Sequence, residues 1–458
     1  MSHTRHVSAA FQLVLLISLA VPAYCGDASG WRTDGTGYYA DADPPRTWSD
    51  EKNVAWKTEL PGRSHSSPVV SADRVFVCSE PAELLCLNVS DGEILWQKSH
   101  EWSDVFPPEK VAEIEASYVQ AKVLEEQRKQ LHRKFGELRK ADPEGNKAKI
   151  DELIEQAFSL KARCKELLRY PPPRRGASGN SAATPVTDGH IVVALFGTGV
   201  LAAHTVEGER LWMTHIEVAQ SGFGHSASPI LVDGLVIVHI RDMVALDAKT
   251  GKEVWRSKLS ARWGTPVATT IGDTPVIVTP GGSIIRVKDG VELASRLFRL
   301  GNNSPIVAGN IVYAMEPGGF RAFRLPDEAA DQVEVEVLWE GGGTRQRTFA
   351  SPVLHDGQIF SVTESGIFEV TDAATGKLIE RRRMEFEKGR VYASVTAAGG
   401  LVFVGCDNGE TSVMKAGGDF EEIARNRCEG YSSCPVFAGK RAFLRTKSHL
   451  YCISEMGS

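Results

Sequence analysis

The stretch ASPILVDGLVIVHIRDMVALDAKTGKEVW, Ala227–Trp255, decides the fold. Turn residues at Asp233-Gly234, Arg241-Asp242 and Thr250-Gly251 divide it into four short, β-rich runs. Four such runs separated by tight turns are typical of an antiparallel meander. Because one meander cannot bury both of its faces, it must pack against further sheets of the same kind.

The opening phrase of this stretch, a small residue and proline before an apolar run, returns along the chain, with its copies mostly about 40 residues apart. The other copies are SSPVV at Ser66–Val70, ATPVT at Ala183–Thr187, GTPVA at Gly264–Ala268, NSPIV at Asn303–Val307, ASPVL at Ala350–Leu354, ASVTA at Ala393–Ala397 and SCPVF at Ser433–Phe437. Eight copies of one supersecondary unit predict an all-β fold, an eight-bladed β-propeller.

The two ends of the chain indicate how the ring closes. After the last copy there is room for only three strands, the final one at Leu450–Ile453. The sequence Asn53–Lys57 matches Glu253–Arg256 and precedes the first copy. We therefore expect the N-terminal strand to complete blade eight, which would leave no exposed sheet edge.

Five tryptophans fall on the expected fourth strands and are predicted to wedge between neighbouring blades: Trp56, Trp96, Trp212, Trp255 and Trp339. Three glycines, Gly92, Gly208 and Gly251, each precede a tryptophan by four residues and fit turns that need a positive φ. We interpret these positions as packing residues that dock the blades, with no role in ligand binding.

The spacing Ala245-x-Asp247-x-x-Thr250-Gly251-x-x-x-Trp255 resembles the tryptophan-docking motif of the pyrroloquinoline quinone (PQQ) repeat. That repeat builds the eight-bladed quinoprotein alcohol dehydrogenases. Similar spacings begin at Cys86 and Ala202, and the resemblance covers roughly Asn53–Ile453 apart from one insertion. It implies the propeller fold, whereas the motif itself concerns the packing of blades and does not specify a cofactor.

For an active member, the resemblance implies calcium held by acidic and amide ligands, an aspartate base and a disulfide between adjacent cysteines above PQQ. This chain has no Cys-Cys pair and no CxxCH sequence. We therefore expect a non-catalytic branch with no catalytic residues, no metal and no cofactor, and keep PQQ with calcium as the alternative.

The N-terminus has the pattern of a secretory signal peptide. His3, Arg5 and His6 precede the apolar run Phe11–Ala20, and cleavage fits after Ala23 or Cys25. Residues 1–25 are thus predicted to be removed on export to the periplasm or cell envelope, leaving an N-terminal extension at 26–52 and no transmembrane segment. Tyr24 stands where a lipidated Cys25 would need a small residue, which disfavours a lipid anchor.

Residues 108–170 interrupt the propeller segments 53–107 and 171–458. They are rich in strong helix formers, with apolar residues at three-and-four spacing on both sides of a break at Asp142–Asn146. The insertion is predicted to be an antiparallel coiled-coil hairpin. It could contact a protein partner, or it could be a solvated decoration, and the sequence leaves both open.

The loops before each repeated proline are expected to surround one mouth of the central channel. Their residues form the predicted ligand site: His65, Asn180, His225, Trp263, Asn302, Arg347, Tyr392 and Tyr431. The alternative for each is a polar loop residue that merely faces water.

Among the cysteines, Cys428 and Cys434 flank a short connection and are the pair best placed for a disulfide. The net charge is −6, and no basic stretch interleaved with aromatics occurs, so no nucleic-acid partner is expected.

The sequence thus predicts an exported, non-catalytic binding or scaffold protein with protein partners. Three alternatives stay open: a PQQ-dependent dehydrogenase with a divergent site, a propeller similar to the one in the outer-membrane protein assembly machinery, and a structural protein of the cell envelope.

Overall fold

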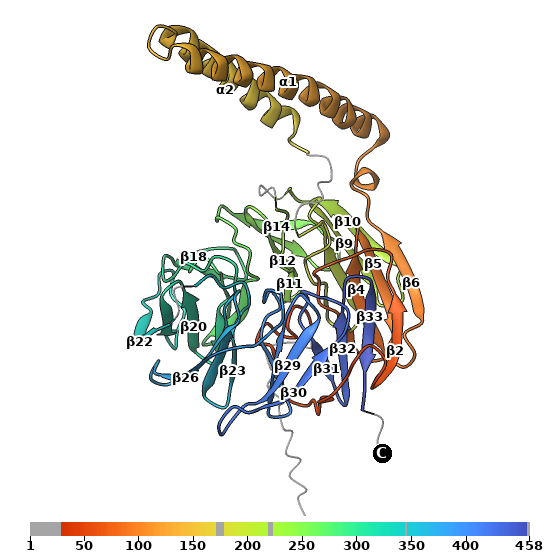
Figure 1. Ribbon diagram of the computed structural model, residues 1–458. Coiled ribbons are helices and arrows are strands. Elements are labelled where there is room, and N and C mark those ends of the chain that lie inside the picture. Colours follow the sequence, from red (N-terminus) through yellow and green to blue (C-terminus); the bar gives the residue numbers. More distant parts are fainter. Residues whose placement is uncertain (1–28, 171–177, 219–222, 344–345, 456–458) are drawn as a thin grey trace, which may run out of the picture.

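Eight four-stranded antiparallel units form a ring around a central axis, and a helical hairpin leaves one face of the ring (Figure 1). The computed structural model describes residues 29–170, 178–218, 223–343 and 346–455. The predicted all-β, eight-bladed propeller with an inserted helical hairpin is confirmed. The predicted signal peptide at residues 1–25 lies outside the described residues.

Blade one contains β3 (Val69–Ser71), β4 (Arg74–Ser79), β5 (Glu83–Asn88) and β6 (Ile94–Ser99). Blade two contains β7 (Val186–Thr187), β8 (Ile191–Leu195), β9 (Val200–Thr205) and β10 (Arg210–His215). Blade three contains β11 (Ile230–Val232), β12 (Leu235–His239), β13 (Met243–Asp247) and β14 (Glu253–Ser257), and blade four contains β15 (Val267–Ile271), β16 (Thr274–Val278), β17 (Ile284–Arg286) and β18 (Glu292–Ala294).

Blades five to seven are β19 (Ile306–Ala308), β20 (Ile311–Glu316), β21 (Gly319–Arg324) and β22 (Glu336–Gly342); β23 (Val353–His355), β24 (Gln358–Val362), β25 (Ile367–Asp372) and β26 (Leu378–Arg383); and β27 (Thr396–Ala398), β28 (Leu401–Gly405), β29 (Glu410–Lys415) and β30 (Glu422–Arg427). Blade eight combines β31 (Val436–Ala438), β32 (Arg441–Arg445) and β33 (His449–Ile453) with the N-terminal β2 (Val54–Glu59).

Ring closure follows the prediction. Strand β2 pairs antiparallel with β33, with Val54 opposite Ile453 and Glu59 opposite His449. The backbone N–H of Ser454 also donates to the carbonyl of Asn53 at 2.8 Å. The first and last strands of the propeller therefore belong to one sheet, and that sheet joins the ends of the ring.

Each docking tryptophan bonds to the next blade in the ring. The Trp212 indole Nε1 donates to the Ala248 carbonyl at 2.8 Å, and its ring lies over Gly251, where an added Cβ would come within 2.5 Å of the indole. The same arrangement pairs Trp56 with Gly92, Trp96 with Gly208, Trp255 with Gly290 and Trp339 with Gly376. A glycine therefore accommodates the tryptophan of the preceding blade.

A belt of hydroxyl–amide bonds explains the small polar residue before each repeated proline. The N–H of Ser67 donates to Thr184 Oγ1 at 3.0 Å, and the N–H of Thr184 donates to Ser228 Oγ at 2.9 Å. Equivalent bonds join Ser228 to Thr265, Ser304 to Ser351, Ser351 to Ser394 and Cys434 to Ser67. The repeated phrase thus ties consecutive blades together beside the axis.

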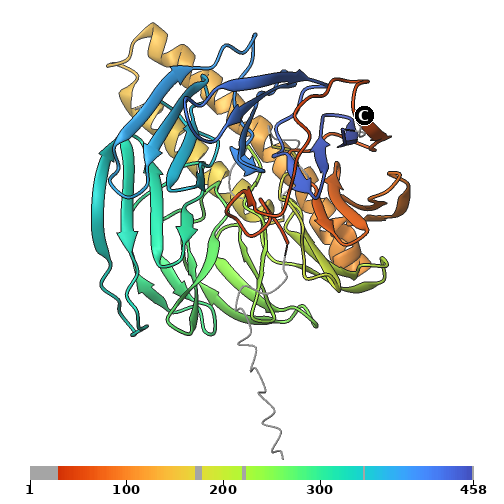
Figure 2. The same ribbon diagram turned by 90° about the horizontal axis from the view of Figure 1, so that it is seen from below.

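The N-terminal extension enters the ring from the face opposite the helices (Figure 2). Ser29, the first residue that the structure describes, forms a β-bridge with Thr187 of blade two. Strand β1 (Tyr38–Tyr39) pairs parallel with β27 of blade seven. Between them Arg32 is fully buried, and its guanidinium donates to the carbonyls of Pro352 and Val395 at 2.8 and 2.7 Å. The extension therefore crosses the axis and fastens blades on both sides of it.

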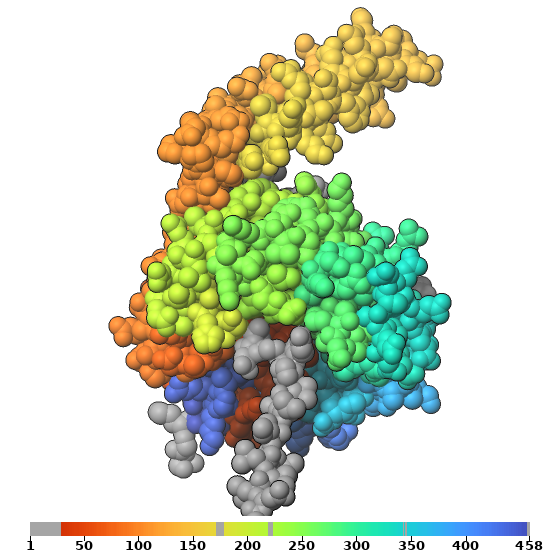
Figure 3. Space-filling model, turned by 180° about the vertical axis from the view of Figure 1, so that it is seen from behind, coloured from red at the N-terminus to blue at the C-terminus, as the bar shows by residue number. Residues whose placement is uncertain are grey.

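The inserted hairpin consists of α1 (Pro108–Ala141) and α2 (Lys147–Leu167), which we call the arm. The 34 residues of α1 correspond to about 50 Å at 1.5 Å per residue. Ile114, Ala121 and Leu124 of α1 are buried, as are Ile150, Ala157 and Cys164 of α2. The arm joins the propeller at its base and overhangs the ring (Figure 3). Neither helix, nor any other helix of the described chain, is long and apolar enough to span a membrane.

An aromatic cluster fixes the base of the arm. The rings of Phe106 and Tyr170 lie 5.2 Å apart, and both contact His215 of β10, at 5.4 and 5.3 Å. Trp102, in the short helix η1 (Trp102–Val105), lies 6.2 Å from Tyr118 of α1. Rings packed in this way hold the two ends of the insertion together on blade two.

Candidate functional site

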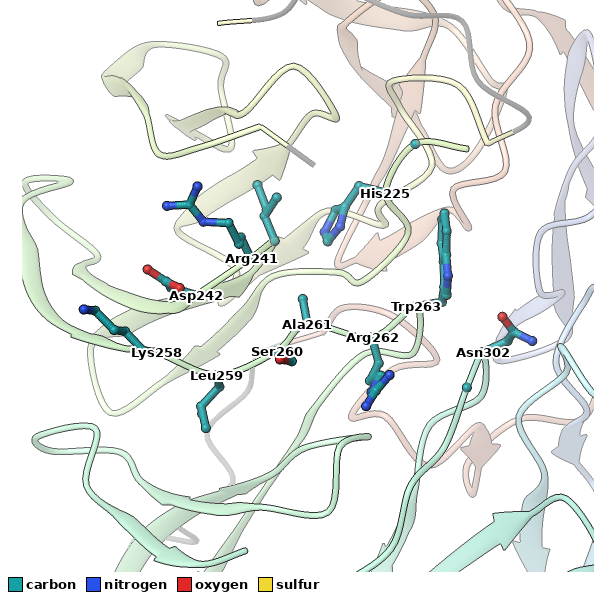
Figure 4. A pocket seen from close by; sticks show the side chains of 13 residues that line it. His225, Arg241, Asp242, Lys258, Leu259, Ser260, Ala261, Arg262, Trp263 and Asn302 are labelled. Atoms are coloured by element: carbon teal, nitrogen blue, oxygen red, sulfur yellow. The ribbon is translucent and has the colours of Figure 1, made fainter. Parts of the chain in front are cut away.

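Three of the eight predicted mouth residues line one cavity on the face from which the arm leaves. His225, Trp263 and Asn302 surround a space of about 660 Å³ between blades three and four. Its walls come from the β12–β13 turn and from the links that lead into blades three, four and five. Figure 4 shows Arg241, Asp242 and Lys258 along one side and Trp263 with Asn302 at the other end. We call this space the mouth cavity.

The other five predicted residues lie elsewhere. His65 is exposed, and Asn180 is buried with its N–H donating to Glu80 Oε1 at 2.6 Å. Arg347 stacks on Phe349, whose ring lies 5.0 Å from the ring of Tyr392. Tyr431 is only 2% exposed and bonds to the Thr411 hydroxyl within the hydrophobic core. Of the eight predicted residues, His225, Trp263 and Asn302 line the mouth cavity, and the Asn302 amide also donates to the carbonyl of Thr348, next to Arg347.

His225 is the most buried of the polar groups around the mouth cavity. Its side chain is 5% exposed, and its Nε2 has no hydrogen-bond partner among the described residues. Burial lowers the pKa of His225 to about 4, so the ring is neutral at pH 7. A buried polar atom without a partner is costly, and a ligand could supply the missing hydrogen bond.

Positive charge dominates the rest of the mouth cavity. Glu217, outside the lining, pairs with Arg241 and Arg256 at 3.3 Å, and Arg256 also lies 3.6 Å from Asp242. Lys258 has no ion-pair partner within the described chain, and the Nε of Arg262 is buried without a hydrogen bond. The arrangement can hold an anionic ligand with a flat face against Trp263.

The basic side chains of this cavity are absent from the predicted site. The prediction covered only the residue that stands just before each proline phrase, whereas Arg241 is in a strand turn and Lys258 and Arg262 stand earlier in the link. Reading each whole link together with the neighbouring β12–β13 turn would have found them.

The described residues do not fit the calcium–PQQ arrangement that the resemblance implies. No group of three or more His, Cys, Asp or Glu side chains in the described chain could hold a metal ion. The carboxylates nearest the mouth cavity, Asp242 and Glu217, are already engaged by arginines. We therefore derive no chemical step through this cofactor.

The expected disulfide between Cys428 and Cys434 is wrong. Both cysteines are buried and free. The Cys428 sulfur lies 3.9 Å from the Gly409 carbonyl, whereas Cys434 occupies the proline-phrase position of blade eight, where its N–H bonds to Ser67. The short connection between them leads from an outer strand to the axis, so closeness in sequence does not bring the thiols together.

A second groove lies on the arm itself and has a volume of about 250 Å³. Its floor is apolar and comes from both helices: Leu131, Phe135, Leu153, Ile154, Ala157 and Phe158. Three basic or titratable side chains, Arg128, His132 and Lys161, complete its lining. Phe158 is 64% exposed, which is unusual for a large aromatic residue. We call this the arm groove.

Buried histidines should make the protein less stable in acid. Burial lowers the pKa of His225, His239 and His100 to about 4 and that of His204 to about 3. These histidines bind protons near pH 6.5 in the unfolded chain but stay neutral in the folded protein. The free energy of unfolding therefore decreases as the pH falls from 6.5 toward 4. We expect a loss of about 1.4 kcal/mol per histidine per pH unit within this window.

Urea unfolding between pH 7 and pH 4.5 measures this effect. His204→Gln should reduce the slope of the free energy of unfolding against pH, whereas His132→Gln, an exposed position on α1, should leave it unchanged. Equal slopes in both variants and the original chain would contradict the assignment.

Comparison with known proteins places the chain in a family. A family model described as outer membrane protein assembly factor BamB matches residues 46–123 and 240–458. No curated protein matches the sequence. BamB from Moraxella catarrhalis has a similar structure, with a TM-score of 0.56 and 13% identity over 88% of this chain and 97% of that chain.

Two dehydrogenases are also similar in structure. A europium-containing methanol dehydrogenase has a TM-score of 0.57 and 11% identity over 93% of this chain and 98% of its own. A quinohemoprotein alcohol dehydrogenase from Comamonas testosteroni has a TM-score of 0.57 and 11% identity over 94% and 82%. At such identities these likenesses show the fold alone. The family model matches more than half of the residues of this chain, so the chain belongs to the family of the outer membrane protein assembly factor BamB.

Proposed function

We propose that this protein is an exported, non-catalytic binding scaffold of the periplasm or cell envelope, and that it engages protein partners through the arm. One observation carries the proposal. The arm stands off the ring and exposes large apolar side chains. Val119 is 67% exposed, and Phe158, which lines the arm groove, is 64% exposed. Exposed apolar surface bounded by polar residues is typical of a protein-binding site.

The base of the arm supports the same proposal. The contacts of Phe106 and Tyr170 with His215 anchor the base of the arm on blade two. A surface that is already ordered loses less conformational entropy when a partner binds. The family description, an outer membrane protein assembly factor, also supports protein binding and an envelope location.

Removal of the arm should abolish partner binding without unfolding the propeller. Residues 110–169 can be replaced by Gly-Ser-Gly, because the rings of Phe106 and Tyr170 already lie 5.2 Å apart. We expect the variant to keep the circular dichroism and melting temperature of the propeller. In a pull-down from envelope extract with the mature chain as bait, it should lose the partner that the full chain retains. A folded variant that keeps every partner would contradict the role of the arm.

The dehydrogenase alternative has its own test. The full chain is incubated with PQQ and calcium and then assayed for alcohol-dependent dye reduction and for the absorbance of bound quinone. We expect neither signal, because the carboxylates near the mouth cavity are paired with arginines. Turnover of an alcohol would overturn the non-catalytic assignment.

A further inference from the structure

Basic side chains are concentrated toward the tip of the arm. Residues 128–149, which span the distal part of α1, the turn and the start of α2, contain eight Lys and Arg against three Asp and Glu. Residues 108–127, nearer the base, contain two Lys and Arg against five Asp and Glu. The facing stretch of α2 adds Asp151, Glu152 and Glu155, so residues 128–161 together contain nine Lys and Arg against six Asp and Glu. The distal arm therefore carries an excess of positive charge on a chain whose net charge is −6.

The distal cations are available to a partner. Arg128 and Lys129 pair with Glu125 and Glu126 at 2.6 and 2.7 Å. The following six are exposed and form no ion pair with any residue that the structure describes: Arg133, Lys134, Arg139, Lys140, Lys147 and Lys149. They lie in the same part of the molecule as the arm groove, and their mutual repulsion favours a negatively charged partner.

The arm groove has the shape that a third helix would fill. Leu131 and Phe135 are four residues apart on α1, and Ile154 and Phe158 are four residues apart on α2, so each pair lies on one side of its helix. An amphipathic helix laid along the groove would place its own apolar stripe against these side chains and complete a three-helix bundle.

The turn at the tip argues against a lipid surface as the occupant. Residues Asp142–Asn146 carry two carboxylates and no large apolar side chain that could enter a bilayer. The apolar side chains lie instead along the side of the hairpin, between the two helices.

We propose that the arm groove docks an amphipathic helix with acidic flanks, supplied by a partner protein. The inference rests on the proposed function and specifies the partner chemistry: an apolar stripe at i, i+3, i+4 and i+7, with Glu or Asp facing the distal cations. Lys161 lines the groove and forms no ion pair with any residue that the structure describes, so it can pair with such a carboxylate, whereas Arg128 is already paired with Glu125.

A designed peptide tests this chemistry on the full chain. The probe is a fluorescent helix of about 18 residues with a Leu stripe and Glu flanks, and its control has Lys in place of Glu. We expect the Glu peptide to bind, the Lys peptide to bind at least about tenfold more weakly, and binding to weaken when salt rises from about 50 to about 300 mM.

Paired substitutions locate the site. Phe158→Glu and Phe158→Ala should weaken the Glu peptide about tenfold or more. Val123→Glu introduces the same charge at a residue that is 54% exposed on α1 but does not line the groove, and it should leave binding unchanged. Circular dichroism shows that each variant is folded.

Four outcomes would overturn the inference: no binding of the Glu peptide to the folded chain, equal binding of the Lys peptide, equal effects of Phe158→Glu and Val123→Glu, or binding only to anionic lipid vesicles or to duplex nucleic acid. If the arm-dependent partner is still captured from envelope extract while the peptide fails, the proposed function stands and only this partner chemistry is wrong.

Discussion

A chain that begins at Leu60, and therefore lacks β2, should not form a stable ring. Trp56, 8% exposed, packs in the core with Phe443 and bonds through Nε1 to the Val89 carbonyl of blade one. Loss of a buried tryptophan alone costs about 3–5 kcal/mol, and the truncation also exposes the edge of β33. Since whole domains are stable by only about 5–15 kcal/mol, we expect aggregation or cooperative unfolding at low urea, measured by size-exclusion chromatography and urea titration.

A circular permutant separates the role of β2 from other effects of truncation. Residues 53–59 are moved behind Glu455 through a short turn, which is possible because Val54 lies opposite Ile453 in an antiparallel pair. This chain lacks the N-terminal extension too, yet should recover a folded ring. If truncated chain and permutant were equally stable, closure by the N-terminal strand would not be what holds the ring together.

Gly251→Ala should reduce the free energy of unfolding much more than the same substitution at Gly418, a second turn glycine. The backbone at Gly251 has a φ of +67°, and an added Cβ would lie 2.5 Å from the Trp212 indole. The left-handed conformation costs about 1–2 kcal/mol with a side chain, and displacement of the indole adds a packing loss of similar or larger size. We expect a loss of about 3 kcal/mol or more in the free energy of unfolding.

Gly418→Ala is the matched control. Gly418 occupies the corresponding turn of blade seven with a φ of +71°. A Cβ added there would meet no atom within 4 Å, since blade six carries Glu380 where five other blades have tryptophan. Only the conformational cost of about 1–2 kcal/mol should remain. Equal losses in the two variants would show that the tryptophan contact contributes little.

The repeat made the fold predictable because each blade needs the same turns and the same buried runs. The partners between blades were not predictable from one copy. Trp212 and Gly208 are close in sequence, yet Trp212 packs on Gly251 of the next blade. Likewise, the residue before each proline looked merely small, and only the ring geometry shows that its hydroxyl accepts an N–H from a neighbouring blade.

The candidate site was predictable only in part, because the links between blades do not repeat. His225, Trp263 and Asn302 meet at the mouth cavity, whereas the equivalent Tyr431 turns into the core. The N-terminal extension has no periodic pattern that would place Arg32 at the axis. The arm was predictable from its three-and-four spacing, but its exposed Phe158 depends on how α1 and α2 face each other.

Photo-crosslinking in living cells tests the central claim, that the arm binds protein. A benzophenone amino acid is introduced in place of Phe158 in the arm groove and, as a control, in place of Leu378, which is 40% exposed on β26 of the propeller. The account predicts discrete protein adducts at position 158 and none of these at position 378. Adducts that are absent at 158, or identical at both positions, would contradict it.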